Sequence, residues 1–204
     1  MDAVVFATKG NLMSSQRSLQ LAKTGFELMD KKRNILIREM MLLVNKANAI
    51  QEQIDAVFSE AYQALQAANV SAGVVEHIAE AVPIDNSVRI LMRSVMGVEV
   101  PVVSGEDEDS SHVPYSLFET SATFDDAYVN FKKVKKLCRE LAEVENSVYR
   151  LAIAIKKTQR RANALKNIVI PRLETTIKFI SESLEEKERE EFSRLKVIKK
   201  QKTE

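Results

Sequence analysis

The side chains that could perform nucleophilic or metal chemistry are few in this 204-residue chain, and they lie far apart. There are two histidines, His77 and His112, and one cysteine, Cys138. They lack the short spacings of a structural zinc site. Cys138 follows Leu137, an apolar position of a helical repeat, so we expect a buried or half-buried thiol rather than a nucleophile. A single cysteine also excludes an internal disulfide and is typical of a reducing compartment.

Phosphate and carboxylate chemistry is equally poorly supported. The sequence contains no glycine-rich phosphate loop of the P-loop or dinucleotide type. The acidic run at 106–109 lacks the spaced oxygen ligands and the glycine of a calcium loop. Paired carboxylates otherwise fall in stretches expected to be solvated helix ends. The sequence therefore predicts a protein that is not an enzyme, with no catalytic residue, no cofactor and no bound metal.

The most distinctive charged feature is the run from Lys156 to Arg161, which is followed by Lys166. Within it, Thr158 occupies an apolar-repeat position and thins the apolar stripe. Two interpretations stay open: a solvated basic face, or an electrostatic contact with an acidic partner that basic side chains steer and hold. A second basic stretch lies at 31–38, where we expect the aliphatic part of Arg33 to cover the seam.

Two heptad repeats indicate the elements that must position these side chains. In the first, steps of seven from Leu12 to Ala68 and from Ser15 to Ala64 give 17 positions, of which 15 are apolar. In the second, steps of seven from Val134 to Thr176 and from Leu137 to Phe179 give 14 positions, of which 11 are apolar. Apolar residues three and four apart form the seam of a coiled coil. Repeats at the two ends of one chain predict an antiparallel pair of helices.

The composition agrees with long solvated helices. Charged residues make up 29% of the chain and aromatic residues 6%, and the net charge is +1. No global field therefore points to nucleic acid or to a membrane surface. No apolar run approaches the roughly 20 residues that span a bilayer, and the first residues do not resemble a signal peptide. We expect a cytosolic protein, or one on the cytoplasmic side of a membrane, without direct membrane insertion.

The predicted fold class is all-α dominated: a long antiparallel coiled coil with a small β-hairpin head in the middle of the chain. Residues 1–70 form the N-terminal helix, 71–120 a short helix and the hairpin with its acidic loop, and 121–204 the C-terminal helix. Thr8 or Asn11 caps the first helix, and Pro171 bends the last one.

Alternating β-forming residues predict the strands of the head. The runs at 87–93 and 98–103 form a hairpin, and 115–120 adds a third short strand. Pro101 indicates an edge position. We expect the head to lie at the far end of the helical pair.

The C-terminal half resembles a known family. The resemblance lies in Arg161-Ala162-Asn163-Ala164-Leu165, in Ile170-Pro171, and in the segments 176–180, 184–191 and 194–196. Thr8-Lys9 with Leu12, and Lys31-Lys32-Arg33, are similar to the opening helix of the same family. These residues resemble the D subunit of V-type and archaeal-type (A-type) rotary ATPases, and the resemblance covers the whole chain.

The resemblance implies a rotor in the central stalk of such an ATPase. It implies a left-handed antiparallel coiled coil whose terminal ends insert into a hexamer of catalytic A and regulatory B subunits. The lower part would bind the small F subunit of the central stalk and dock on the funnel subunit of the membrane rotor ring. The shaft would couple ATP hydrolysis or synthesis to ion translocation, as a peripheral part of a membrane-bound complex on its cytoplasmic side. No nucleic acid partner is implied.

Antiparallel pairing places residue 12 near residue 187 and residue 68 near residue 131. On this basis we expect contacts to the hexamer from Lys156, Lys157, Arg160, Arg161, Lys166, Arg189 and Arg194. We expect contacts to the small stalk subunit around Ile54, Val57, Val134 and Leu137. The alternative function is a coiled-coil tether or scaffold that bridges two partners without rotating.

Overall fold

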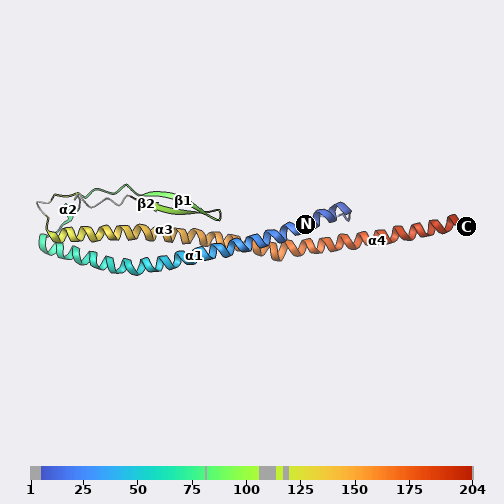
Figure 1. The fold of residues 1–204 in the computed structure, drawn as a ribbon, viewed down its shortest axis with the longest axis horizontal. Helices are drawn as coiled ribbons and strands as arrows, with labels where there is room; N and C mark the ends of the chain where they lie inside the picture. Colours follow the sequence, from blue (N-terminus) through green and yellow to red (C-terminus); the bar gives the residue numbers. More distant parts are fainter. Residues whose placement is uncertain (1–5, 81, 106–113, 117–119, 204) are drawn as a thin grey trace. The chain divides into compact units, whose positions relative to one another are not determined.

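The structure, a computed structural model, describes residues 6–80, 82–105, 114–116 and 120–203 (Figure 1). Its elements in chain order are α1 (Lys9–Ala72), α2 (Glu76–Ala79), β1 (Arg89–Val95), β2 (Val98–Ser104), α3 (Ala122–Ala164), a π-helical segment (Leu165–Val169) and α4 (Ile170–Thr203). The predicted class is confirmed: long helices at both ends of the chain and a two-stranded hairpin in its middle. The chain forms two compact units, Ile35–Ile155 and Lys156–Glu204 with Met1–Asn34, and helix α1 contributes to both.

Helix α1 begins where the sequence offers a cap. The Thr8 hydroxyl accepts a 3.2 Å hydrogen bond from the backbone N–H of Asn11, so Thr8 is the N-cap. The Asn11 side chain instead donates to the carbonyl oxygen of Phe6 at 2.8 Å. At the other end, Gly73 follows the helix with φ +78°, a left-handed conformation that ends helices and that glycine adopts at little cost.

In the unit Ile35–Ile155, the predicted seam is the core. Ile50 and Ile54 of α1 are buried against Val144 of α3. Leu137 and Leu141 pack at the edge of the same cluster. The heptad positions of the two repeats thus meet as the spacing predicts, because residues three and four apart share one helix face.

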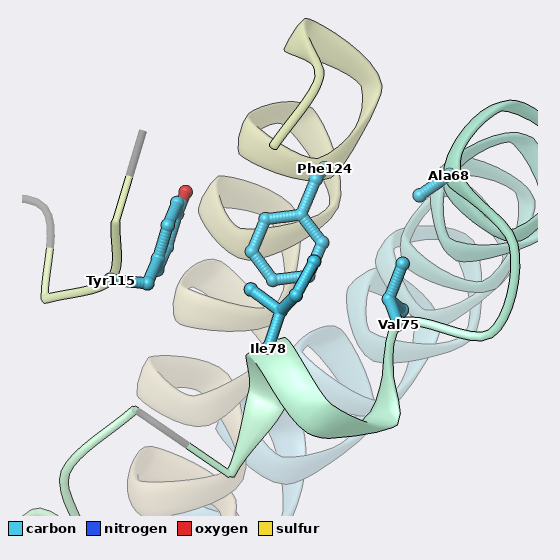
Figure 2. Packing of buried hydrophobic residues seen from close by; sticks show 5 residues of the cluster. All are labelled: Ala68, Val75, Ile78, Tyr115 and Phe124. Carbon is cyan, nitrogen blue, oxygen red and sulfur yellow. The ribbon is translucent and has the colours of Figure 1, made fainter. Parts of the chain in front are cut away.

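A second cluster closes this unit where α1 ends and α3 begins (Figure 2). It contains Ala68, Val75, Ile78, Tyr115 and Phe124, all buried. The rings of Tyr115 and Phe124 meet edge to face with centroids 4.8 Å apart, a favourable arrangement for aromatic pairs. The ring of Phe131 meets that of Tyr62, with centroids 5.7 Å apart. Phe131 thus lies opposite a residue six positions before Ala68, and the predicted pairing of residue 68 with residue 131 is wrong by that amount. The short helix α2 brings Ile78 into this cluster and so covers the end of the seam.

The hairpin joins β1 to β2 through Met96 and Gly97, whose φ values are 51° and 75°. Positive φ at both turn residues is the signature of a type I′ turn, which matches the twist of the strands. The predicted position at the far end of the helical pair is wrong. Val100 of β2 is buried against Leu36 of α1 and Leu151 of α3, so the hairpin lies along the helices. Packing along the helices is more favourable than a hairpin that projects from their end, because it buries the apolar face of the strand.

The predicted third strand is not formed by the residues that can be described. Tyr115, Ser116 and Thr120 belong to no strand, and residues 117–119 lie outside the described residues, as does the acidic run at 106–109. Tyr115 packs on α3 instead, where its hydroxyl donates a 2.7 Å hydrogen bond to Oδ1 of Asp125. Burial and this carboxylate raise the pKa of Tyr115, which keeps the hydroxyl a donor.

In the other unit, the N-terminal part of α1 packs on α4 and on the end of α3. Ala22, Ala162 and Ile180 are buried. Lys9 Nζ lies 2.9 Å from Glu188 Oε1, and Lys23 Nζ lies 2.8 Å from Glu174 Oε1. The ion pair of Lys9 confirms that the first turns of α1 lie opposite the stretch around residue 187.

Pro171 interrupts the last helix by a mechanism that the sequence did not reveal. The bonding pattern changes before the proline, at the π-helical segment, whose end is marked by the Ile170 N–H donating to the Leu165 carbonyl. Pro171 has no N–H for the carbonyl of Asn167, and its ring would clash with that carbonyl in a regular α-helix. A wider π turn relieves that clash and inserts one residue into the helix.

Candidate partner-binding surfaces

The basic cluster lies on exposed positions around a buried seam. Thr158 and Ala162 are buried, whereas the four basic residues of the run are exposed: Lys156, Lys157, Arg160 and Arg161. Lys156 with Arg160, and Lys157 with Arg161, form like-charge pairs at i,i+4, which destabilise an isolated helix. Within the part of the chain that the structure describes, no ion pair neutralises these four side chains. The cluster therefore presents unneutralised positive charge on the surface.

Beside the cluster, Arg33 crosses from α1 to α3. Its side chain is 25% exposed, and its Nη2 lies 2.6 Å from Oδ1 of Asp30. Its Nη1 donates a 2.8 Å hydrogen bond to Oε1 of Gln159, and Gln159 in turn donates to Asn163 at 2.8 Å. Arg33, the residue expected to cover the seam, thus also belongs to a polar network. Sequence reasoning missed Asp30 and Gln159, although an arginine at a heptad position signals that a polar group must face it.

Lys166 is used differently from the rest of the cluster. Its Nζ lies 5.9 Å from the centroid of the Phe26 ring, within the range of a cation–π contact. Lys166 is exposed, and it lies in the π-helical segment. This residue therefore joins α1 to the segment before Pro171 while remaining exposed.

Arg189 and Arg194 lie on the terminal part of α4. Each faces a carboxylate one turn earlier: Arg189 lies 3.8 Å from Glu185, and Arg194 lies 3.6 Å from Glu190. Both arginine side chains are more than three-quarters exposed. Ion pairs this exposed contribute little to stability, so a partner could exchange them without a large cost.

The four residues expected at the small stalk subunit lie in the seam. Ile54 and Val134 are buried, and Val57 and Leu137 are half-buried. Ile54 and Leu137 take part in the cluster around Val144. These side chains hold the two helices together, so Val57 and Leu137 are the two that retain surface for a partner.

Cys138 is exposed, and the expectation of a buried or half-buried thiol is wrong. Leu137 points into the seam, and the next residue of a helix is turned by about 100°, which carries Cys138 out of the seam. The thiol lies instead on the wall of a hollow between α3 and the hairpin.

An ionic contact outside the seam joins Asp85 to α3. Its carboxylate forms an ion pair with Lys135 and accepts a 2.7 Å hydrogen bond from the backbone N–H of Ser87. The hydrogen bond from Lys135, followed by Ser87, holds the pKa of Asp85 well below its ordinary value. This contact fixes the segment that leads into β1. Among the described residues, no three His, Cys, Asp or Glu side chains gather as a metal site would require.

The comparisons with known proteins agree with this arrangement of helices and hairpin. The family model for the D subunit of ATP synthase matches residues 11–200. The chain belongs to the ATP synthase D-subunit family. The V-type ATP synthase D subunit of Thermotoga neapolitana is 43% identical over 197 residues, covering 96% of this chain and 97% of the relative.

Two relatives named as A-type subunits match nearly as much of this chain. The A-type ATP synthase D subunit of Methanopyrus kandleri is 41% identical over 195 residues, covering 94% of this chain and 84% of the relative. That of Thermococcus kodakarensis is 37% identical over 196 residues, covering 94% and 92%. As a member of the D-subunit family, the chain is part of a rotary ATPase complex. None of its helices, over the residues described, is long and apolar enough to cross a membrane.

Proposed function

We propose that this chain is the central rotor shaft of a V/A-type rotary ATPase, a non-catalytic subunit. In this role it couples ATP hydrolysis or synthesis in a catalytic hexamer to ion translocation across the membrane. One observation carries the proposal. Lys9, the first residue of α1, pairs with Glu188, but α4 continues to Thr203. The rest of α4 thus extends past the end of its partner helix.

The side chains on this extension support insertion into another protein. Phe192 is 71% exposed and Leu195 is 64% exposed, and Val197 and Ile198 are also exposed. Apolar side chains on a single helix without a facing helix are stabilised when a partner covers them. We assign this cover to the hexamer of catalytic A and regulatory B subunits, whose central cavity would receive the end of α4.

The basic residues define a second contact with the same hexamer. The exposed cluster of α3 carries like charges one turn apart, so acidic side chains at the mouth of the hexamer would relieve its repulsion. The proposed set is Lys156, Lys157, Arg160, Arg161, Lys166, Arg189 and Arg194. Exposed charged side chains suit a shaft that must exchange contacts as it turns, because such pairs are individually weak.

The proposed remaining partners bind the unit formed by Ile35–Ile155. The small F subunit of the central stalk would contact the helical pair near Val57 and Leu137, which retain exposed surface beside the buried Ile54 and Val134. The funnel subunit of the membrane rotor ring would receive the end where α1 passes into α2. The shaft would then work as a peripheral subunit on the cytoplasmic side of the membrane.

Native mass spectrometry of the chain co-expressed with catalytic and regulatory subunits tests the assembly. A single copy on a six-membered ring, with ATPase activity that depends on it, is the expected result. Cys138 is exposed and is the only cysteine of the chain, so a maleimide-linked probe there reports rotation. Three-fold stepping driven by ATP supports a rotor. A probe that stays fixed while ATP is hydrolysed would identify a non-rotating tether.

A truncation tests the observation that carries the proposal. Ending the chain after Glu188 removes the part of α4 that extends past α1, and we expect loss of the shaft from the ring. The matched control replaces Glu185 and Glu190 by glutamine, which breaks local ion pairs only. Retention of the truncated shaft at wild-type affinity would refute the role of this extension.

A further inference from the structure

The outer edge of β2 is covered by side chains of α3. Two α3 residues bond its outward backbone groups: Glu143 Oε2 accepts from the Val103 N–H at 2.8 Å, and Arg150 Nη1 donates to the Glu99 carbonyl at 3.3 Å. Between them, Ser147 Oγ lies 3.4 Å from the Pro101 carbonyl oxygen, but its one hydroxyl hydrogen goes to the shorter 2.7 Å bond with the Glu143 carbonyl. The helix residues are four and three apart, on one face, and the strand residues are two apart, on one edge. Pro101 fits this edge because its missing N–H is not needed for pairing with β1.

The outer edge of β1 has no such cover. The two-residue turn makes Val95 and Val98 the closing pair, which exchanges hydrogen bonds, and every second pair along the ladder does the same. The intervening residues of β1 therefore direct their backbone N–H and C=O groups away from β2. These residues are Ile90, Met92 and Ser94. Over the described part of the chain, β1 pairs with β2 alone, and nothing bonds these outward groups.

The side chains of β1 are exposed on both faces. Ile90 is 65% exposed, Leu91 59% and Met92 55%. Ile90 and Met92 lie over a hollow of about 530 Å³ whose floor is formed by α3, including Ala142. On the other face, Arg89 and Arg93 flank Leu91, because residues two apart in a strand share a face. A seven-residue strand with a free edge and exposed apolar side chains is a template for strand pairing.

Charge selects the kind of strand that can pair there. β1 carries Arg89 and Arg93 and no acidic residue. Two copies of β1 placed edge to edge would bring together positive charges only, and like charges oppose strand pairing. An added strand with acidic residues opposite the two arginines would instead form cross-strand ion pairs. The arginines thus act against self-association and in favour of an acidic strand.

We propose that the outer edge of β1 is a β-augmentation site for an extended segment of a partner protein. In sequence order, this segment has one acidic residue, three apolar residues and a second acidic residue. Its acidic residues lie opposite Arg93 and Arg89, its central residue lies opposite Leu91, and the two between them contact Ile90 and Met92. Main-chain bonds to the outward groups of β1 supply affinity, and the alternating side chains supply specificity. This inference is independent of the rotor proposal, since it concerns the isolated chain.

A synthetic peptide tests the site on the full chain. The probe has the sequence Thr-Glu-Val-Leu-Val-Glu-Thr, and its control has lysine in place of both glutamates. We expect the acidic probe to shift the amide resonances of Ile90, Met92 and Ser94 and to slow their hydrogen exchange by about ten-fold at saturation. The lysine control should bind at least about five-fold more weakly. An acidic probe that leaves these three amides unchanged at millimolar concentration would overturn the proposal.

Two variants separate main-chain pairing from other binding. Met92→Pro removes an outward N–H without removing a bond to β2, and should weaken binding of the probe by about ten-fold or more. Met92→Ala keeps the N–H and loses only the side-chain contact, so it should weaken binding less. The double variant Arg89→Glu with Arg93→Glu should bind the lysine peptide more tightly than the acidic probe. This reversal tests the proposed pairing even if Met92→Pro disturbs the hairpin. Equal binding by Met92→Pro with an intact hairpin would show that the probe uses the hollow alone. If the chain self-associates and thereby excludes the probe, β1 pairs with a second copy of the chain and not with a partner strand.

Discussion

Arg33 and Gln159 form a 2.8 Å hydrogen bond that joins α1 to α3 where the apolar seam is interrupted. The guanidinium also pairs with Asp30, so a heptad position that would ordinarily hold an apolar side chain holds a polar network. Such a network fixes the register of two helices when every member is bonded, and weakens them when one member is removed.

The first prediction concerns this network. Arg33→Ala should lower the free energy of unfolding by about 1 kcal/mol, because it removes a partly buried hydrogen bond and leaves Gln159 without it. Replacing both Arg33 and Gln159 by leucine should restore that loss or exceed it, since an apolar pair continues the seam. Urea unfolding measures both, with exposed Lys31→Ala as the control. A double-leucine variant less stable than Arg33→Ala would contradict this account.

The second prediction compares two glycines. Gly73 has φ +78°, and Gly10 lies in the first turn of α1; a Cβ at either would meet nothing within 4 Å. Gly73→Ala should destabilise the chain by about 1 kcal/mol, because alanine is strained in the left-handed region. Gly10→Ala should be neutral or stabilising by up to about 1 kcal/mol. Thermal unfolding distinguishes them, and equal effects would show that backbone conformation does not decide the difference.

The third prediction is a pH dependence at Asp85. The pKa of Asp85 in the folded chain lies below the ordinary value of 3.8. At a pH between the folded and unfolded pKa values, the unfolded chain therefore binds a proton that the folded chain does not. The stabilisation is therefore complete above the unfolded pKa and is lost as the pH falls through the folded pKa. We expect Asp85→Asn to be less stable than wild type above about pH 5, and the gap to narrow below about pH 4.

Urea unfolding across this range measures the gap, and Lys135→Ala is its control. Because Lys135 is the principal cause of the lowered pKa of Asp85, Lys135→Ala should lose about as much stability as Asp85→Asn. The double variant should be little less stable than either single variant. A gap that stays constant or widens on acidification would exclude the ion pair as its source.

The seam could be predicted from the sequence, whereas the hairpin's position could not. Burial at Leu36, Ile54 and Val144 follows from spacing along one helix, which is local information. The packing of Val100 on Leu36 joins residues far apart in the chain, and no local pattern encodes it. Cys138 is exposed although it follows a seam residue, because adjacent residues of a helix point in different directions.

The candidate binding residues likewise include features that the sequence could predict and features that it could not. Exposure of the basic run could be predicted, since its members fall outside the heptad positions, and the structure places Lys156 and Arg161 on the surface. The network of Arg33 with Gln159 could not, because it depends on how two helices face each other. Ile54 and Val134 occupy heptad positions, so spacing predicts their burial in the seam. It does not predict that Val57 and Leu137, at heptad positions as well, stay half-buried.

The fourth prediction concerns Pro171 and the π-helical segment. Pro171→Ala supplies the missing N–H and removes the ring, so the segment should become regular α-helix, with the new amide donating to Asn167. Stability should rise by about 1 kcal/mol, less than the full helix-interior difference between proline and alanine. Hydrogen exchange of the new amide at residue 171 reports the bond in the variant.

The same variant bears on coupling. If the segment before Pro171 gives the shaft an asymmetry that rotation uses, Pro171→Ala should change the ratio of ions moved to ATP hydrolysed in the assembled complex. A more stable shaft with unchanged torque and turnover would assign the proline to local helix geometry alone.

The last prediction concerns the basic cluster. On the proposed function, replacing Arg160, Arg161 and Lys166 by alanine should weaken binding of the chain to the hexamer and reduce the salt dependence of that binding. Arg160 and Arg161 are exposed and unpaired within the described residues, so their removal should not lower the stability of the isolated chain and should relieve repulsion. Lys166 should contribute a small loss through its contact with Phe26.

The control separates charge from composition. Lys46→Ala with Lys133→Ala removes positive charge from exposed positions of the unit Ile35–Ile155, and Lys166→Ala alone measures the cost of the cation–π contact. Affinity for the ring is measured at several salt concentrations, because attraction between exposed charges is screened over about 10 Å at 0.1 M salt. If the triple variant binds as tightly as wild type at every salt concentration, the cluster is a solvated face. If the loss is largest at low salt and disappears at high salt, the cluster acts through charge at the mouth of the hexamer.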